Sequence, residues 1–361
     1  MRHARLVPAV ASLLISLALA EMAAAQDLPR VRLVATGGTI SNRAGGRLTA
    51  DDLLGLIPDV RRVVRPEAEQ FSNVSSSELT LAQWLALSRR LNELYATEKD
   101  LGGIVVTSGT DTLEELAYFL HLTVRDARPV VVVGSMRNPS TVGYEGAANL
   151  LEAFRVAASP DARGQGVLVV LNDEINSARE VTKTDALRLH TFQSRTAGVL
   201  GVVDPDRVVF YRGVVTRHTA RSEFDVAKLT ALPRVDVLLV YQDAPGDLIK
   251  AAVDAGAKGL VLATAGAGAT SGTQGEGIQY ATAHGAVVVT TTRAGSGRIA
   301  ARGGPVPERF GNREVSAEER QSFTQRVAGE DLAPVKARLL LMLALTKTKD
   351  PAEIQRMFTE Y

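Results

Sequence analysis

The 361-residue chain contains no cysteine, which excludes disulfide bonds, a cysteine nucleophile and thiolate zinc sites. Its five histidines are few and scattered, so the sequence does not indicate a His-ligated metal site. The formal net charge is only +1, and no basic surface indicates a nucleic-acid partner. Charged residues make up 22% of the chain, which is typical of a globular protein. We therefore predict an enzyme or binding protein without metal, cofactor or nucleic acid.

Long apolar runs are also missing, with one exception at the N-terminus. Arg2 and Arg5 precede an apolar stretch at 6–20, and residues 23–25 are all Ala. This pattern predicts a signal peptide over residues 1–25 and a periplasmic or secreted mature protein. The alternative, an uncleaved anchor, requires a span of about 20 apolar residues, longer than this run. Cleavage would remove two Arg and one Glu, leaving a net charge of 0 and a protein without membrane contact.

Short apolar runs alternate with helical periodicity in the first half of the chain. Continuous runs at 31–35, 103–107, 130–134 and 166–171 are typical of strands buried on both faces of a parallel sheet. Between them, apolar residues recur at helical spacing, first from Leu81 to Tyr95 and then from Leu113 to Leu120. This alternation predicts an α/β fold with a doubly wound, mostly parallel sheet.

A second α/β series follows the polar stretch 217–222 and Pro233. We expect strands at 235–241, 259–264 and 286–292, helices between them, and two final helices, the last beginning at Asp350-Pro351. The glycine-rich segments 265–277 and 295–304 are predicted to be loops. The predicted organisation is a signal peptide (1–25), a larger N-terminal catalytic domain (26–214), a linker (215–233) and a smaller C-terminal parallel-sheet domain (234–361).

The first chemical candidate is the segment TGGTI at 36–40, directly after the first predicted strand. Ligands of open α/β sheets bind at the carboxyl ends of the strands. Two glycines allow the backbone to bring a hydroxyl close to a ligand, although an ordinary tight turn would explain them as well. A phosphate-binding loop is disfavoured, because neither GxGxxG nor a GK[ST] ending is present.

The second candidate is TSGTDT at 107–112, after the strand 103–107. Thr112 and Glu115 have the spacing of a capping box, so a helix start explains part of the segment. A cap requires neither Thr110 nor Asp111. Asp111 would stay ionised near a helix N-terminus and could hold a cation, and Thr110 could offer its hydroxyl and N–H group to a reacting centre.

The third candidate is Lys183 in VTKT at 181–184, which follows a predicted polar loop at 172–180. A single lysine is usually a solvated surface charge. Here, however, three such segments follow successive strands of one predicted sheet. Their side chains should therefore meet at one edge of that sheet.

Taken together, these segments resemble the bacterial L-asparaginase/glutaminase family. The resemblance covers essentially the whole mature chain in order, and it rests on seven segments: ATGGTIS at 35–41, TSGTDTLEELAYFL at 107–120, VVVGSMR at 131–137, VLVVLND at 167–173, EVTKT at 180–184, RHTARSEFDVAKL at 217–229 and KARLLLMLALTKTKDP at 336–351.

The resemblance implies that Thr39 is the nucleophile that attacks a side-chain amide. Thr110, Asp111 and Lys183 would form a second set, which handles protons and activates water to release an acyl-enzyme. A threonine hydroxyl needs a base that takes its proton, so this grouping is chemically reasonable. The family also implies a homotetramer in which a neighbouring subunit completes each site.

Substrate contacts are also implied by the family pattern. Ser76, in the turn 75–77, matches the residue that binds the substrate α-carboxylate, and Asp111 would face the α-ammonium group. Ser77 and Ser135 are the further substrate-binding candidates. The small-molecule amide is the only partner we predict besides other copies of the chain.

Several positions depart from the family pattern, and most of them concern substrate recognition. In the larger predicted domain, Ser108 stands where the family usually has a His, the loop 41–50 lacks the usual Tyr, and Ser77 stands in place of a Gln. In the smaller one, Ala267 stands where the family has an Asn supplied by the neighbouring subunit, and Gly303-Gly304 stands in place of an acidic residue. Glu308 would take the place of that acidic residue if the loop is shifted.

We therefore predict an amidohydrolase of L-asparaginase type, which converts L-asparagine or L-glutamine to the acid and ammonia. The alternatives are a periplasmic solute-binding protein and a catalytically decayed relative that only binds an amino acid. Binding alone does not require paired threonines with a lysine and an aspartate, which favours the enzyme.

Overall fold

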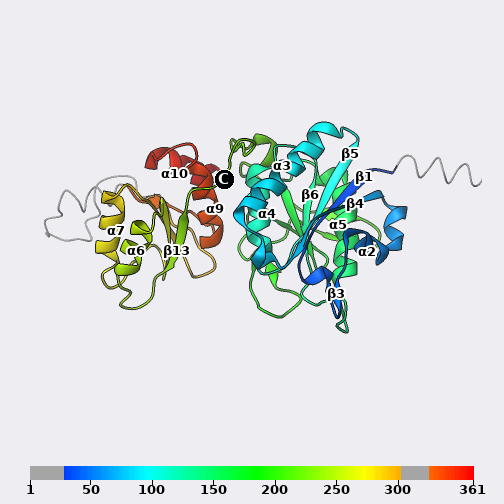
Figure 1. Cartoon of the computed structure of the whole chain (residues 1–361), viewed down its shortest axis with the longest axis horizontal. Coiled ribbons are helices and arrows are strands. Elements are labelled where there is room, and N and C mark those ends of the chain that lie inside the picture. The colour runs from blue at the N-terminus through cyan, green and yellow to red at the C-terminus, as the bar shows by residue number, and fades with distance from the viewer. Residues whose placement is uncertain (1–27, 302–324) are drawn as a thin grey trace, which may run out of the picture.

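The computed structural model describes residues 28–301 and 325–361, which form two lobes placed side by side (Figure 1). The predicted signal peptide, Gly303, Gly304 and Glu308 lie outside the described residues. Within the described ranges, no helix is both long and apolar enough to cross a membrane.

The larger lobe is built on an eight-stranded sheet. In spatial order its strands are β12 (Val208–Phe210), β11 (Gly201–Val203), β8 (Glu174–Ser177), β7 (Val167–Leu171), β6 (Val130–Val133), β5 (Leu101–Thr107), β1 (Arg30–Gly37) and β4 (Arg65–Val74). The five strands from β7 to β4 are parallel, and the three at the other edge are antiparallel. The smaller lobe has four parallel strands in the order β13 (Val235–Leu239), β14 (Gly259–Thr264), β15 (Val287–Thr292) and β16 (Val327–Ala328). The predicted α/β class, with one large and one small sheet, is confirmed.

The direction of strand addition reverses at β1. After β1 the chain adds β4 on one side, and then returns to add β5, β6 and β7 on the other. Such a reversal leaves a crevice at the carboxyl ends of the two strands that flank it. The loops after β1 and β5 flank this point, and they carry two of the three predicted motifs.

Strand side chains alternate between two apolar cores. In β5, Ile104 and Val106 pack on the side of α3 (Leu81–Thr97) and α4 (Leu113–Thr123), while Val105 packs on the opposite side. That opposite side is covered by α2 (Ala50–Gly55) and α5 (Gly146–Ala158). Both faces are buried, which is why these strands are continuous apolar runs.

The small sheet is also covered on both faces. The helices α6 (Asp247–Asp254) and α7 (Gln274–Ala283) pack on one face, and α9 (Pro334–Ala344) and α10 (Pro351–Glu360) lie on the other. The α9 side belongs to the same apolar core as α3 and α4, so this core continues from one lobe into the other. Helix α9 therefore connects the two lobes physically, as its place between them in Figure 1 shows.

Three local predictions need correction or completion. The predicted polar loop 172–180 contains the strand β8, which pairs antiparallel with β7. Helix α7 begins at Gln274, inside the predicted glycine-rich loop 265–277. Sequence reasoning also did not identify β4, α2 or α5. The exact domain boundaries at 214 and 234 stay predictions.

Candidate active site

The carboxyl ends of β1 and β5 are held together by two hydrogen bonds, which buried Thr36 donates to buried Thr107. The Thr36 hydroxyl donates to the Thr107 carbonyl oxygen at 2.6 Å, and the Thr36 N–H group donates to the Thr107 hydroxyl at 3.1 Å. Their backbones are in register, with Ala35 opposite Thr107. The loops after the two strands therefore leave the sheet from adjacent points.

Glycines bring three loops into backbone contact at this edge. Gly38 has a φ of +88°, and a Cβ atom there would lie 2.2 Å from the Gly109 nitrogen. A Cβ atom on Gly109 would lie 2.7 Å from the Ser76 Oγ atom. The loops after β1, β4 and β5 can approach this closely only because two of the contacting residues lack side chains.

Thr39 follows Gly38 and begins a short 3₁₀ helix, Thr39–Ser41. The Ser41 hydroxyl donates to the Gly38 carbonyl oxygen at 3.1 Å, which stabilises the turn. The Thr39 side chain is half-buried, and its hydroxyl has no hydrogen-bond partner among the described residues. It is therefore available to a ligand.

Thr110, Asp111 and Lys183 are in direct contact. Lys183 lies in β9 (Thr182–Lys183), which pairs with β10 (Phe192–Gln193). Its Nζ atom donates to the Thr110 hydroxyl at 3.0 Å and to Asp111 Oδ1 at 2.9 Å. The Lys183 side chain is only 16% exposed, whereas that of Asp111 is 75% exposed. Lys183 is thus held inside the site, while the Asp111 carboxylate also faces solvent.

The helix start predicted after Asp111 is correct, but the predicted capping box is not formed. Helix α4 begins at Leu113, and Thr112 makes no side-chain capping hydrogen bond. Its hydroxyl donates instead to the Ser76 carbonyl oxygen at 3.3 Å, which links the β4 and β5 loops. The Glu115 carboxylate lies 3.8 Å from Arg338 on α9 and so points to the other lobe.

The three candidate serines occupy different environments. Ser76 is buried beside Gly109, and Ser77 is exposed in the same turn. Ser135 is fully buried, and its hydroxyl donates to the Arg137 carbonyl oxygen at 2.6 Å. Ser76 is thus the serine closest to the contacting loops, and the substrate-binding roles of all three stay predictions.

Sequence reasoning missed three charged residues around these loops. Glu114 accepts hydrogen bonds from the Lys183 segment, and Lys336 reaches the same segment from α9. Arg47 donates through Nη2 to the Ser75 hydroxyl at 3.3 Å, and its buried Nη1 atom has no hydrogen-bond partner within residues 28–301 and 325–361. Glu114 lies in the first turn of α4, close to Thr110 in the sequence, which was a usable signal, whereas no local pattern identifies Lys336.

Two further features bear on what this edge of the sheet can bind. Among residues 28–301 and 325–361, no cluster of three or more metal-ligating side chains is found. A cavity of about 570 Å³ lies at the junction of the lobes, lined by residues of β13, α6 and α9, and none of the candidate residues lines it. The strand ends instead bring Thr110, Asp111 and Lys183 together.

Known proteins resemble the chain over nearly its whole length. The family described as "Asparaginase, N-terminal" matches residues 30–216, and the "Glutaminase/Asparaginase C-terminal domain" matches residues 234–358. The L-asparaginase 2 of Bacillus subtilis (strain 168) is 40% identical over 93% of this chain and 88% of its own. A probable periplasmic L-asparaginase of Haemophilus influenzae is 36% identical over 94% of this chain and 95% of its own. The crystal structure of a probable cytoplasmic L-asparaginase from Campylobacter jejuni superposes with a TM-score of 0.83 at 38% identity, covering 92% of this chain and all of that one.

Proposed function

Because the chain belongs to the asparaginase/glutaminase family and is an amidohydrolase of that type, we propose that it hydrolyses the side-chain amide of L-asparagine or L-glutamine through a threonine acyl-enzyme. The products are the corresponding acid and ammonia. The observation that carries the proposal is the contact of Lys183 with both Thr110 and Asp111, beside the loop of Thr39.

In the first step, the Thr39 oxygen attacks the amide carbon and loses its proton to a base. The C–N bond breaks, and the leaving nitrogen takes up a proton and departs as ammonia. The substrate acyl group is then an ester of Thr39. The unpartnered, half-buried hydroxyl of Thr39 supports this role, because it need not break an existing hydrogen bond to react.

In the second step, water attacks the ester and the Thr39 hydroxyl is restored. We assign proton removal from this water to Thr110 and Lys183. Their 3.0 Å hydrogen bond gives a direct path for the proton, and Asp111 keeps the Lys183 side chain oriented. General acid–base catalysis of this kind contributes typically 10²- to 10⁴-fold in rate.

Substrate recognition is assigned to the residues around Thr39. The exposed carboxylate of Asp111 has an oxygen available for the substrate ammonium group, beyond the one that Lys183 occupies. Ser76 would bind the α-carboxylate, at the point where the loops after β1, β4 and β5 meet. Ser77 and Ser135 complete this substrate-binding assignment.

The alternatives of a solute-binding protein and a decayed relative have no observation in their favour. Both would bind an amino acid without turning it over. The test is ammonia release by the purified mature protein with L-Asn, L-Gln, D-Asn and N-blocked amides. Release of ammonia from L-Asn or L-Gln supports the proposal, and stabilisation by these ligands without ammonia release contradicts it.

Export and oligomeric state complete the proposal. The pattern of residues 1–25 supports a periplasmic or secreted enzyme, as does the periplasmic relative from Haemophilus influenzae. N-terminal sequencing of the exported protein would test this, with a new N-terminus near residue 26 expected. The family resemblance supports a homotetramer, which light scattering would measure.

A further inference from the structure

The backbone of the Lys183 segment is held from the smaller lobe by a buried lysine. Lys336, on α9, donates through Nζ to the Arg179 carbonyl oxygen at 3.1 Å and also to the Val181 carbonyl oxygen. Its side chain is only 1% exposed. It thus fixes two carbonyl groups immediately before Lys183.

The same segment is held from the larger lobe by Glu114. Its Oε1 atom accepts hydrogen bonds from the Thr182 hydroxyl at 3.1 Å and from the Lys183 N–H group at 3.2 Å. Its Oε2 atom has no hydrogen-bond partner in the described part of the chain and lies 3.8 Å from Lys336 Nζ. Glu114 lies in the first turn of α4, so it ties the Lys183 backbone to the helix that begins just after Thr110 and Asp111.

We propose that Glu114 and Lys336 are positioning residues, which together hold Lys183 within hydrogen-bond distance of Thr110 and Asp111. Through α9, the smaller lobe thereby takes part in a reaction whose chemical groups all lie in the larger one. This inference rests on the catalytic role of Lys183 under the proposed function.

A positional role explains why charged groups are kept at this buried place. Burial, together with the charge of Arg179, lowers the pKa of Lys336 to about 8 against the opposing effects of Glu114 and Glu180. A buried ion pair is weak evidence for stability, because apolar residues of similar volume often stabilise a protein equally well. Apolar side chains, however, could not hold the carbonyl and N–H groups of the segment.

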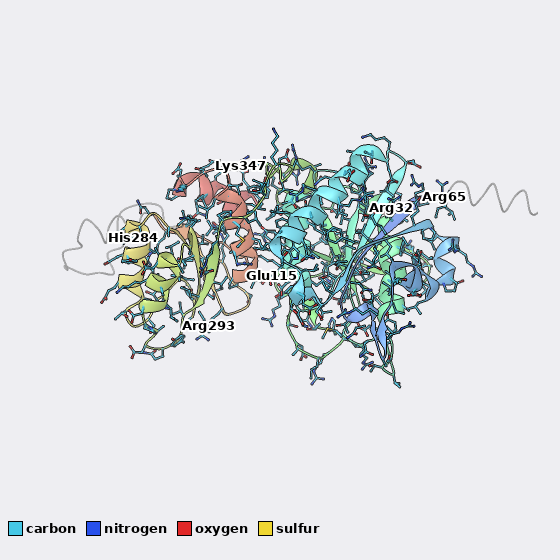
Figure 2. The ribbon with its side chains drawn as sticks, viewed as in Figure 1. Arg32, Arg65, Glu115, His284, Arg293 and Lys347 are labelled. Atoms are coloured by element: carbon cyan, nitrogen blue, oxygen red, sulfur yellow. The ribbon has the colours of Figure 1, made fainter. Side chains whose placement is uncertain are left out.

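The neighbouring residues on the same two helices provide a matched control. Glu115 and Arg338 form an ion pair between α4 and α9 with the same separation of 3.8 Å. Figure 2 shows Glu115 at the junction of the two lobes. Arg338 donates to the Val235 carbonyl oxygen at 3.0 Å, and neither residue hydrogen-bonds the Lys183 segment. Removing this pair disturbs the junction without releasing Lys183.

The kinetic test compares Lys336→Met and Glu114→Ala with Arg338→Met and Glu115→Ala, in the full chain with L-asparagine. We expect kcat to fall on the order of 10- to 100-fold in the first two, since a displacement of about 1 Å can cost this much. KM should change by less than about 2-fold, because Lys183 acts after binding. The control variants should keep kcat within about 3-fold. Glu114→Gln, which retains an acceptor oxygen, should recover part of the loss in Glu114→Ala.

A crystal structure of Lys336→Met separates this inference from the proposed function. Withdrawal of Lys183 Nζ from Thr110 by more than about 1 Å supports the positioning role. If that withdrawal leaves kcat unchanged, the catalytic role of Lys183 is wrong while the positioning role stands. If Lys183 remains in place and kcat matches the control variants, the positioning role is overturned. Should Lys336→Met not fold, Glu114→Ala carries the same structural and kinetic test.

Discussion

The two sheets end in the same way at one strand each, yet only one of these ends carries the proposed catalytic groups. In the larger sheet, the Thr36 hydroxyl donates to the Thr107 carbonyl oxygen of the adjacent strand at 2.6 Å. In the smaller sheet, the Thr264 hydroxyl donates to the Thr291 carbonyl oxygen, also at 2.6 Å. Both threonines are buried. A buried threonine at this position thus links the ends of two parallel strands, and its presence is not evidence of catalysis.

The loops after these two threonines differ. The Thr264 hydroxyl also accepts a hydrogen bond from the Gly268 N–H group and lies 3.0 Å from the Gly266 carbonyl oxygen, so it closes its own loop. The loop then exposes Ala267. After Thr36, two glycines instead carry the chain against the β4 and β5 loops, and the next side chain is the hydroxyl of Thr39. The proposed catalytic groups therefore lie where the loops after several strands meet.

Among the variants that test this difference between the two strand ends, Thr39→Ala should have the largest effect. We expect kcat to fall on the order of 10³-fold or more, because the proposed nucleophile is removed. Circular dichroism and the unfolding midpoint should be unchanged, since the Thr39 hydroxyl has no hydrogen-bond partner among the described residues. Thr39→Ser is the control and should retain measurable turnover. An alanine variant with most of its activity would show that the nucleophile lies elsewhere.

Lys183→Met should lower kcat by about 10²- to 10³-fold, because the proposed base is lost. The measurement is kcat of both proteins, with Lys250→Met, a partly exposed lysine of the smaller lobe, as control. A Lys183→Met variant that keeps most of its activity would contradict the assignment.

Thr36→Val and Thr264→Val separate the stabilising role that the two threonines share from any effect on the reaction. Each should lower the free energy of unfolding by about 1–3 kcal/mol, because each leaves a buried carbonyl group without its donor. Only Thr36→Val should also lower kcat, since Thr39 follows it by three residues. Denaturant unfolding and kcat would be measured on both. Equal losses of kcat in the two variants would mean that the smaller sheet end also supports the reaction.

The smallest effect is expected for Ala267→Asn, which adds a polar group to the loop after β14. Because Ser77, Ala267 and Gly303-Gly304 replace groups that recognise the substrate in the family pattern, the wild type should prefer L-Asn over succinamic acid by less than about 10⁴-fold in kcat/KM. Ala267→Asn should raise this preference about 10-fold.

Ala265→Asn, in the same exposed loop, is the control for that change and should leave the preference unaltered. A wild-type preference of about 10⁴-fold or more would show that the ammonium group is already tightly bound.

Much of the fold was predictable because both faces of the central strands are buried. Continuous apolar runs located β1, β5, β6 and β7, and helical spacing located α3 and α4. Strand β4 was missed because its side chains are mostly half-exposed and include charges such as Glu67 and Glu69, which pair with arginines of β1 and α3. A search for apolar runs cannot locate a strand whose side chains form ion pairs with neighbouring elements.

The capping box at Thr112 shows the same limit at the scale of one residue. Its spacing to Glu115 was correct, but each side chain found a partner from another part of the chain, the Ser76 carbonyl oxygen and Arg338. The spacing of residues along the chain indicates which hydrogen bonds are possible. Packing against other elements decides which of these hydrogen bonds form.

By itself, the sequence determined the α/β class, the buried strands, and the glycine-rich turns that place Thr39 and Thr110 after them, because periodicity and turn chemistry are properties of neighbouring residues. The family resemblance predicted that Thr110, Asp111 and Lys183 form one group. Only the tertiary structure showed the direct contact of Lys183 with Thr110, 73 residues earlier, and the hydrogen bond of Lys336 to the carbonyl group of Val181, 155 residues before it. Contacts across such separations depend on strand order and on the core that the two lobes share, and no local sequence pattern predicts either of these.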